Sequence, residues 1–185
     1  MTSDSLLNQK LLAHDLIGPT VHLLADLLQK KGWKLASAES CTGGMIAAAC
    51  TDLAGSSHWF ERGFVSYSND AKTELLGVDA ALIARHGAVS EAVVRAMAAG
   101  AISHSKAQVA VAVTGVAGPA GGSAAKPVGT VWFAFAQRVG LPGSSPGLVS
   151  VVSEMRRFDG DRAAVRTATV QHALRRLVEL LRQGA

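Results

Sequence analysis

Residues 108–122 of the chain read QVAVAVTGVAGPAGG. Every position from Val109 to Val113 is valine or alanine, and such an apolar run predicts a strand buried in a sheet. Thr114 and the glycines after it predict a loop that opens at the carboxyl end of this strand. Ligands gather at such strand ends in open α/β sheets, so the stretch also predicts where a site would lie.

Outward from this strand, the pattern predicts four more strands and a helix in most of the intervals between them. The strands are expected at 34–38, 63–67, 128–137 and 148–158, and the helices at 20–31, 42–53, 69–76, 80–85, 90–104 and 162–181. Helices separate the early strands whereas the late strands are neighbours. This order predicts an α/β fold whose mixed central sheet is covered by helices on both sides.

Local signals refine these elements. Asn69 or Asp70 is expected to cap the helix at 69–76, and residues 143–147 are expected to form a surface turn. Gly18-Pro19 interrupts the first helical pattern. We therefore expect a single domain over residues 1–185, in which residues 1–19 form an N-terminal helical extension.

The composition excludes several classes of protein. The chain has 185 residues, of which 49% are hydrophobic and 17% charged, so it can bury a sizeable core and is not disordered as a whole. The net charge is +4, but the basic residues are scattered, and no stripe or patch of cations with interleaved aromatic residues is visible, so we expect no nucleic-acid partner.

The chain also lacks the signals of membranes, secretion and metal binding. No run of 18 apolar residues and no signal peptide is visible, so we expect a cytoplasmic protein without a membrane partner. Cys41 and Cys50 are expected to be buried free thiols. No His-x-x-x-His or Cys-x-x-Cys spacing occurs, and we expect neither a metal site nor a cofactor.

The segment AESCTGG, residues 38–44, lies where a predicted strand meets a predicted helix. A helix start carries unpaired N–H groups and the positive end of the dipole, and small residues let a ligand approach the backbone. Ser40 or Thr42 is therefore a candidate helix cap, anion contact or nucleophile. A plain cap, with glycines needed for packing, is the alternative that the local pattern favours.

The segment YSNDAK, residues 67–72, begins the next helix. Lys72 falls in or near the first turn, where the helix dipole disfavours its charge, and with added desolvation its pKa would drop towards that of a general base. The alternatives are a solvated surface lysine and, for Tyr67, a buried core tyrosine. Three strand ends thus carry Ser40, Tyr67 with Lys72, and Thr114, and we expect them to converge.

Arg162 is expected to begin the C-terminal helix, with Arg166 one turn later. An arginine at a helix start can bind a phosphate group. Pairing with the neighbouring Asp161 is the commoner alternative.

Five segments, in this order, resemble the CinA C-terminal domain family, and the likeness extends over about residues 24–181. They are AESCTGG (38–44), GFVSYSNDAK (63–72), HGAVSE (86–91), TGVAGP (114–119) and KPVGTVW (126–132). The resemblance implies a three-layer α/β/α sandwich, found in dimers or larger homo-oligomers. It also implies hydrolysis of the carboxamide of nicotinamide mononucleotide, a small pyridine nucleotide, to the carboxylate and ammonia.

The resemblance further implies a serine–lysine site. Mapped by motif, Ser40 is the nucleophile, Lys72 is the general base, and Tyr67 and Thr114 line the same pocket. The residues expected to bind the substrate or its phosphate are Glu39, Cys41, Thr42, Gly43, Gly44, Gly115 and Arg162.

Two other functions remain open from the sequence. One is a non-catalytic, nucleotide-binding or regulatory module of the same family. The other is a metal-dependent hydrolase, which the lack of clustered ligands disfavours.

Overall fold

The computed structural model describes residues 17–139 and 148–183, and five strands in these ranges form one sheet. The strands are β1 (Leu35–Glu39), β2 (Phe60–Val65), β3 (Val109–Gly115), β4 (Thr130–Val139) and β5 (Leu148–Arg157). Their order in the sheet is β2-β1-β3-β4-β5. β1 is parallel to both β2 and β3, whereas β4 is antiparallel to β3 and to β5, which confirms the predicted mixed sheet.

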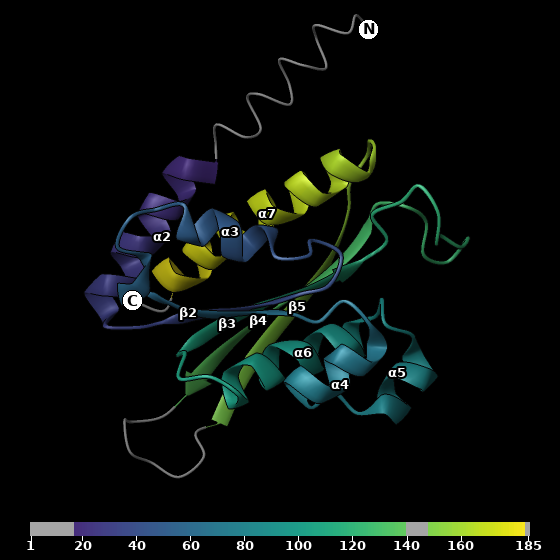
Figure 1. Ribbon diagram of the computed structural model, residues 1–185, viewed down its shortest axis with the longest axis horizontal. Helices are drawn as coiled ribbons and strands as arrows, with labels where there is room; N and C mark the ends of the chain where they lie inside the picture. The colour runs from purple at the N-terminus through teal and green to yellow at the C-terminus, as the bar shows by residue number, and fades with distance from the viewer. Residues whose placement is uncertain (1–16, 140–147, 184–185) are drawn as a thin grey trace, which may run out of the picture.

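Helices cover both faces of this sheet (Figure 1). On one face lie α2 (Ile17–Lys31), α3 (Met45–Thr51) and α7 (Arg162–Gln183), and on the other lie α4 (Asn69–Leu76), α5 (Ala80–His86) and α6 (Glu91–Ser103). A single 3₁₀ turn, η1 (Ser56–His58), precedes β2. The α/β/α sandwich is therefore confirmed. None of the described helices is long and apolar enough to cross a bilayer.

The alternation of valine and alanine in β3 separates two cores. Val109, Val111 and Val113 pack in the cluster beneath α2 and α7, whereas Ala110 and Ala112 pack in the cluster beneath α6. Successive side chains of a strand point to opposite faces, so small residues line only the α6 side. α6 can therefore lie close to the sheet, while α7 rests on larger side chains.

Two predicted boundaries differ because of turn chemistry. α3 begins at Met45, three residues later than predicted, because Gly43 and Gly44 adopt φ values of 59° and 97° that a helix does not contain. Ser68, rather than Asn69 or Asp70, caps α4: its Oγ accepts the N–H of Ala71 at 3.0 Å. β2 also begins and ends earlier than predicted.

Gly18 and Pro19, where we expected an interruption of the helical pattern, both lie within α2 as the structure describes it. Ile17 packs against the core. The division of the chain into a domain and an N-terminal extension stays a prediction. Residues 1–16 and the predicted turn at 143–147 lie outside the described residues.

The strand order decides where a site can form. β2 lies on one side of β1 and β3 on the other. The connection from β1 to β2 and the next one, from β2 to β3, therefore lead to opposite sides of β1. Such a switch point leaves a crevice at the carboxyl ends of the parallel strands. Ser40 follows β1 there, Ser66 and Tyr67 follow β2, and Thr114 is the last residue but one of β3.

Candidate active site

Ser40 lies on a tight turn between β1 and α3. Its N–H donates to the carbonyl of Val113 in the adjacent strand at 3.1 Å, and its own carbonyl accepts the N–H of Gly43 at 3.1 Å. The positive φ values of Gly43 and Gly44 turn the chain back into α3. The side chain is 9% exposed, so the hydroxyl is held at the strand end and largely shielded from water.

Lys72 reaches this hydroxyl from α4. The side chain is 1% exposed, and its Nζ lies 3.2 Å from Ser40 Oγ. Nζ also donates to three backbone carbonyls, those of Ser66 at 2.9 Å, Tyr67 at 3.2 Å and Ser68 at 3.3 Å. The alternative of a solvated surface lysine is therefore wrong.

The surroundings of Lys72 favour the neutral amine. Burial lowers the pKa of Lys72, because desolvation penalises the ammonium form, while the neighbouring Cys41 opposes this shift. A neutral amine within hydrogen-bond reach of a serine hydroxyl is the arrangement that a general base requires.

Cys41 follows the serine but is not set up as a nucleophile. Its side chain is buried, and desolvation raises the pKa of the Cys41 thiol to about 11, so little thiolate forms near neutrality. Burial also raises the pKa of Cys50. Both cysteines are free and buried, as the sequence predicts.

Glu39 and Thr42 lie beneath the turn rather than in the crevice. Both are fully buried, and Thr42 Oγ1 donates to Glu39 Oε2 at 2.7 Å. The N–H groups of Gly44 and Ile46 donate to the same carboxylate oxygen, at 3.1 and 2.9 Å. The Thr42 hydroxyl and the N–H groups of Gly44 and Ile46 are thus used within the protein, and the binding of substrate by Glu39, Thr42 and Gly44 stays a prediction.

Thr114 lies at the crevice but points its hydroxyl elsewhere. Its side chain is buried, and Oγ1 donates to the carbonyl of Ala88 at 2.9 Å, which ties the segment before α6 to the end of β3. Gly115 is required by packing, because a Cβ there would lie 2.8 Å from the carbonyl oxygen of Thr130. Because a glycine has no side chain, Gly115 could contact a substrate only through its backbone.

Tyr67 and Arg162 contact each other beyond the carboxyl ends of β2 and β3. Tyr67 is 59% exposed, so the alternative of a buried core tyrosine is wrong. The Arg162 guanidinium donates to the Tyr67 hydroxyl at 3.1 Å and to the carbonyl of Gly118 at 3.0 Å. Asp161 caps α7 by accepting the N–H of Ala164. Residues 95 positions apart thus meet beside the turn.

Arg166, one helical turn after Arg162, is a functional candidate that the sequence argument passed over. Its Nε donates to the carbonyl of Cys41 at 3.2 Å, and its Nη2 donates to the carbonyl of Thr42 at 2.8 Å. The only signal in the sequence is the spacing of four residues, which places both arginines on one face of the helix.

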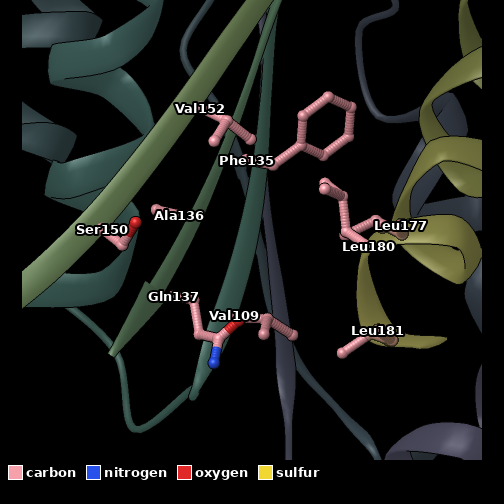
Figure 2. Close-up of a pocket in the computed structure, with 9 residues that line it drawn as sticks. All are labelled: Val109, Phe135, Ala136, Gln137, Ser150, Val152, Leu177, Leu180 and Leu181. Atoms are coloured by element: carbon pink, nitrogen blue, oxygen red, sulfur yellow. The ribbon is translucent and has the colours of Figure 1, made fainter. Parts of the chain in front are cut away.

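The apolar pocket between β4, β5 and the end of α7 is a separate feature (Figure 2). Val109, at the start of β3, and Leu181 are among its lining residues, so it lies at the opposite end of the sheet from Ser40. Among residues 17–139 and 148–183, no three His, Cys, Asp or Glu side chains are grouped as metal ligands.

Comparison with known proteins identifies the family. The model of the "CinA C-terminal domain" matches residues 19–181. A relative from Enterobacter agglomerans, named nicotinamide-nucleotide amidohydrolase PncC, is 53% identical over 156 residues, which cover 82% of this chain and 90% of that protein. The protein of the same name from Escherichia coli K12 is 50% identical over 150 residues, covering 81% and 86%.

A solved structure agrees with these sequence matches. The competence/damage inducible protein CihA from Agrobacterium tumefaciens is similar with a TM-score of 0.78 and 44% identity, over 89% of this chain and 95% of that one. The fold, the order of the motifs and these matches lead to one conclusion. This chain belongs to the CinA C-terminal domain family.

Proposed function

We propose that this protein hydrolyses the carboxamide of nicotinamide mononucleotide to nicotinate mononucleotide and ammonia, with Ser40 as nucleophile and Lys72 as general base. The observation that carries the mechanism is the distance of 3.2 Å between Lys72 Nζ and Ser40 Oγ, in a place shielded from water. The names of the relatives, nicotinamide-nucleotide amidohydrolases, support the substrate.

In the first step, neutral Lys72 takes the proton of Ser40 as Oγ attacks the carboxamide carbon. The C=O double bond becomes a single bond to an oxyanion, and the amine becomes an ammonium. The positive charge of the pyridinium ring withdraws electrons from the carboxamide and favours the neutral form of Lys72 before the step. An amide is a poor electrophile, so this activation of the nucleophile is needed.

The oxyanion requires N–H donors that the turn does not use for itself. Gly43 N–H donates to Ser40 and Gly44 N–H donates to Glu39, so these two are occupied. Arg166 binds the carbonyl of Cys41, and in a trans peptide the N–H of Thr42 then points the opposite way. The N–H groups of Cys41 and Thr42 are therefore our candidates for the oxyanion hole, where one donor contributes about 3 kcal/mol.

Collapse of the tetrahedral intermediate breaks the C–N bond. The ammonium of Lys72 returns its proton to the departing nitrogen, which leaves as ammonia, and Ser40 is left as an ester. Neutral Lys72 then takes a proton from water, whose oxygen attacks the ester carbon. As the C–Oγ bond breaks, the ammonium of Lys72 returns its proton to Oγ, which restores Ser40 and neutral Lys72. The carboxylic acid product then gives its proton to the released ammonia and leaves as the carboxylate.

The phosphate of the substrate needs a cation at the mouth of the crevice. Arg162 is exposed there and holds Tyr67 at its side, so we assign the phosphate to these two residues. Arg166 is half-buried and already binds two carbonyls, which fits a role in the turn rather than on the ligand.

Ammonia release from the purified protein tests this proposal. Nicotinamide mononucleotide should be hydrolysed, and Ser40→Ala and Lys72→Ala should each lower kcat by at least about 10³-fold while the circular dichroism spectrum stays that of the wild type. Nicotinamide, its riboside and NAD, assayed beside it, measure what the phosphate contributes. Binding of the mononucleotide without ammonia release would favour the non-catalytic nucleotide-binding or regulatory module instead.

A further inference from the structure

The carboxylate of Glu39 is unusual in being fully buried among neutral donors. Its Oε1 accepts hydrogen bonds from Ser37 Oγ at 3.2 Å and from Ala47 N–H at 2.8 Å. Its Oε2 accepts from Thr42 Oγ1 at 2.7 Å and from the N–H groups of Gly44 and Ile46. Five donors saturate a carboxylate, and three of them come from the start of α3, whose dipole also favours a negative charge there.

Glu39 is also connected by its backbone to both members of the catalytic pair. Ser40 is the next residue in the chain. The carbonyl of Glu39 accepts a hydrogen bond from the N–H of Ser66 at 2.9 Å, and the carbonyl of Ser66 accepts one from Lys72 Nζ at 2.9 Å. Glu39 is thus bonded directly to Ser40 in the chain and is connected to Lys72 through the backbone of Ser66.

An ordinary helix cap would not need this arrangement. The N-cap residue of α3 is Gly44, which has no side chain to cap with, and Glu39 reaches the same donors from the preceding strand across the turn. Burial of a carboxylate costs several kcal/mol unless its hydrogen bonds repay it, whereas an exposed Ser or Asp caps a helix cheaply. The buried carboxylate instead joins the end of β1 to the start of α3, and so it fixes the turn between them, on which Ser40 lies.

We propose that Glu39 is a positioning residue that holds Ser40 at the distance from Lys72 at which proton transfer occurs, acting in part through Thr42. The inference rests on the proposed function of Ser40 and Lys72. Glu39 has no exposed atom with which to touch a substrate, so its contribution falls on kcat and not on KM. A displacement of about 1 Å at a nucleophile can cost about 10²-fold in rate.

The Glu39→Gln variant keeps the shape of the side chain. In either orientation its amide NH₂ faces at least one backbone N–H, that of Ala47 or those of Gly44 and Ile46, which then loses its acceptor, while a neighbouring hydroxyl can turn to accept instead. We expect kcat to fall about 10²-fold and KM to stay within about threefold of the wild type.

Thr42 supplies a matched pair of variants. Thr42→Val removes the hydroxyl that donates to Glu39, whereas Thr42→Ser keeps it. We expect Thr42→Val to lower kcat about tenfold relative to Thr42→Ser, which keeps both the hydroxyl and the backbone N–H, and to add little in the Glu39→Gln background. Asp79→Ala, which removes the exposed cap of α5, is the control for loss of stability alone and should leave kcat unchanged.

A second readout separates this inference from the choice of substrate. A fluorophosphonate reagent modifies an activated serine: the Ser40 Oγ–P bond forms, fluoride leaves, and Lys72 takes the proton. Mass spectrometry locates the label and gives its rate. Glu39→Gln should label Ser40 more slowly than the wild type, and Thr42→Val more slowly than Thr42→Ser, by the same factors as kcat, while Asp79→Ala should label at the wild-type rate.

The outcomes are distinct. If the wild type labels at Ser40 but releases no ammonia from the mononucleotide, the substrate assignment fails and the labelling rates still test Glu39. If nothing labels at Ser40, the proposed mechanism fails, and this inference with it. A folded Glu39→Gln protein with wild-type rates overturns the inference alone. If Glu39→Gln does not fold, equal rates for Thr42→Val and Thr42→Ser overturn it.

Discussion

At the scale of single residues, the three carbonyls around Lys72 explain how a buried amine can act as a base. A neutral amine has two N–H donors and a lone pair, so it satisfies two of the carbonyls of Ser66, Tyr67 and Ser68 and presents its lone pair to Ser40. After it takes the proton, the ammonium is stabilised by all of these carbonyls. The carbonyls thus offset part of the desolvation cost of the ammonium that forms during the reaction, although burial still favours the neutral amine before it.

The rate should therefore depend on pH through Lys72. Burial lowers the pKa of Lys72, and the base acts only when neutral, so kcat/KM should rise with pH and level off, with a midpoint below the usual lysine value of about 10.4. Ammonia release from pH 6.5 upward measures this. Lys72→Arg, which stays charged, should be inactive throughout, and a midpoint at or above the usual value would contradict the assignment.

The two arginines of α7 should separate into different kinetic effects. Arg162→Met removes an exposed cation beside Tyr67, so we expect KM for the mononucleotide to rise about tenfold, equivalent to about 1.4 kcal/mol, with little change in kcat. Arg166→Met frees the carbonyls of Cys41 and Thr42, so kcat should fall about 10- to 100-fold with little change in KM.

Steady-state kinetics on the mononucleotide and on the riboside measure this separation. The riboside has no phosphate, so Arg162→Met should leave its kinetics unchanged while Arg166→Met still lowers its kcat. The same pattern for both variants would refute the division of roles.

At the scale of elements, close packing of α6 makes its glycine essential. Gly100 lies in the middle of α6, where alanine would normally be preferred by about 1 kcal/mol. A Cβ at this position would lie 2.0 Å from the carbonyl oxygen of Leu76, at the end of α4. Small residues therefore allow close packing twice on this side of the sheet. Alanines of β3 lie beneath α6, and Gly100 lies where α6 contacts α4.

Adding one methyl group to this helical glycine should destabilise the fold. Gly100→Ala should lower the free energy of unfolding by about 1–3 kcal/mol or more, because the backbone atoms of Leu76 cannot move aside easily. Thermal unfolding measures this, and an unchanged or raised Tm would contradict this account.

At the scale of the whole molecule, the strand order collects the site at one end of the sheet. Ser40, Lys72 and Arg162 come from the first, second and last thirds of the chain, yet Lys72 contacts Ser40, and Arg162 contacts Tyr67. A ligand bound there would touch helices from both outer layers, α4 on one face and α7 on the other. Binding should therefore stabilise the fold as a whole rather than one element.

Thermal unfolding of the Ser40→Ala variant tests this without turnover. At 100 times its dissociation constant, nicotinamide mononucleotide should add about 2.7 kcal/mol to the free energy of unfolding and raise Tm by roughly 5–10 °C. Nicotinamide riboside at the same concentration should give a smaller shift. An equal shift with adenosine monophosphate would argue against recognition of the pyridine ring.

Much of the site could be predicted because motif residues stand at strand ends. Ser40, Lys72 and Tyr67 follow parallel strands, and the sheet brings such ends together. The roles of Glu39 and Thr42 could not be predicted, because a carboxylate and a hydroxyl beside a serine are equally compatible with binding a ligand and with a buried structural role. Arg166 was missed because its partners lie 124 and 125 residues away.

The sequence by itself determined the class of fold, the family and the Ser40–Lys72 pair, because these follow from local periodicity and from ordered motifs. Only the tertiary structure decided which polar groups face the crevice. Burial fixes that outcome: it turns Glu39 and Thr42 inward, leaves Tyr67 outside, and takes the water from around Lys72. Solvent exposure depends on every element packed around a residue, and no local stretch of sequence contains that information.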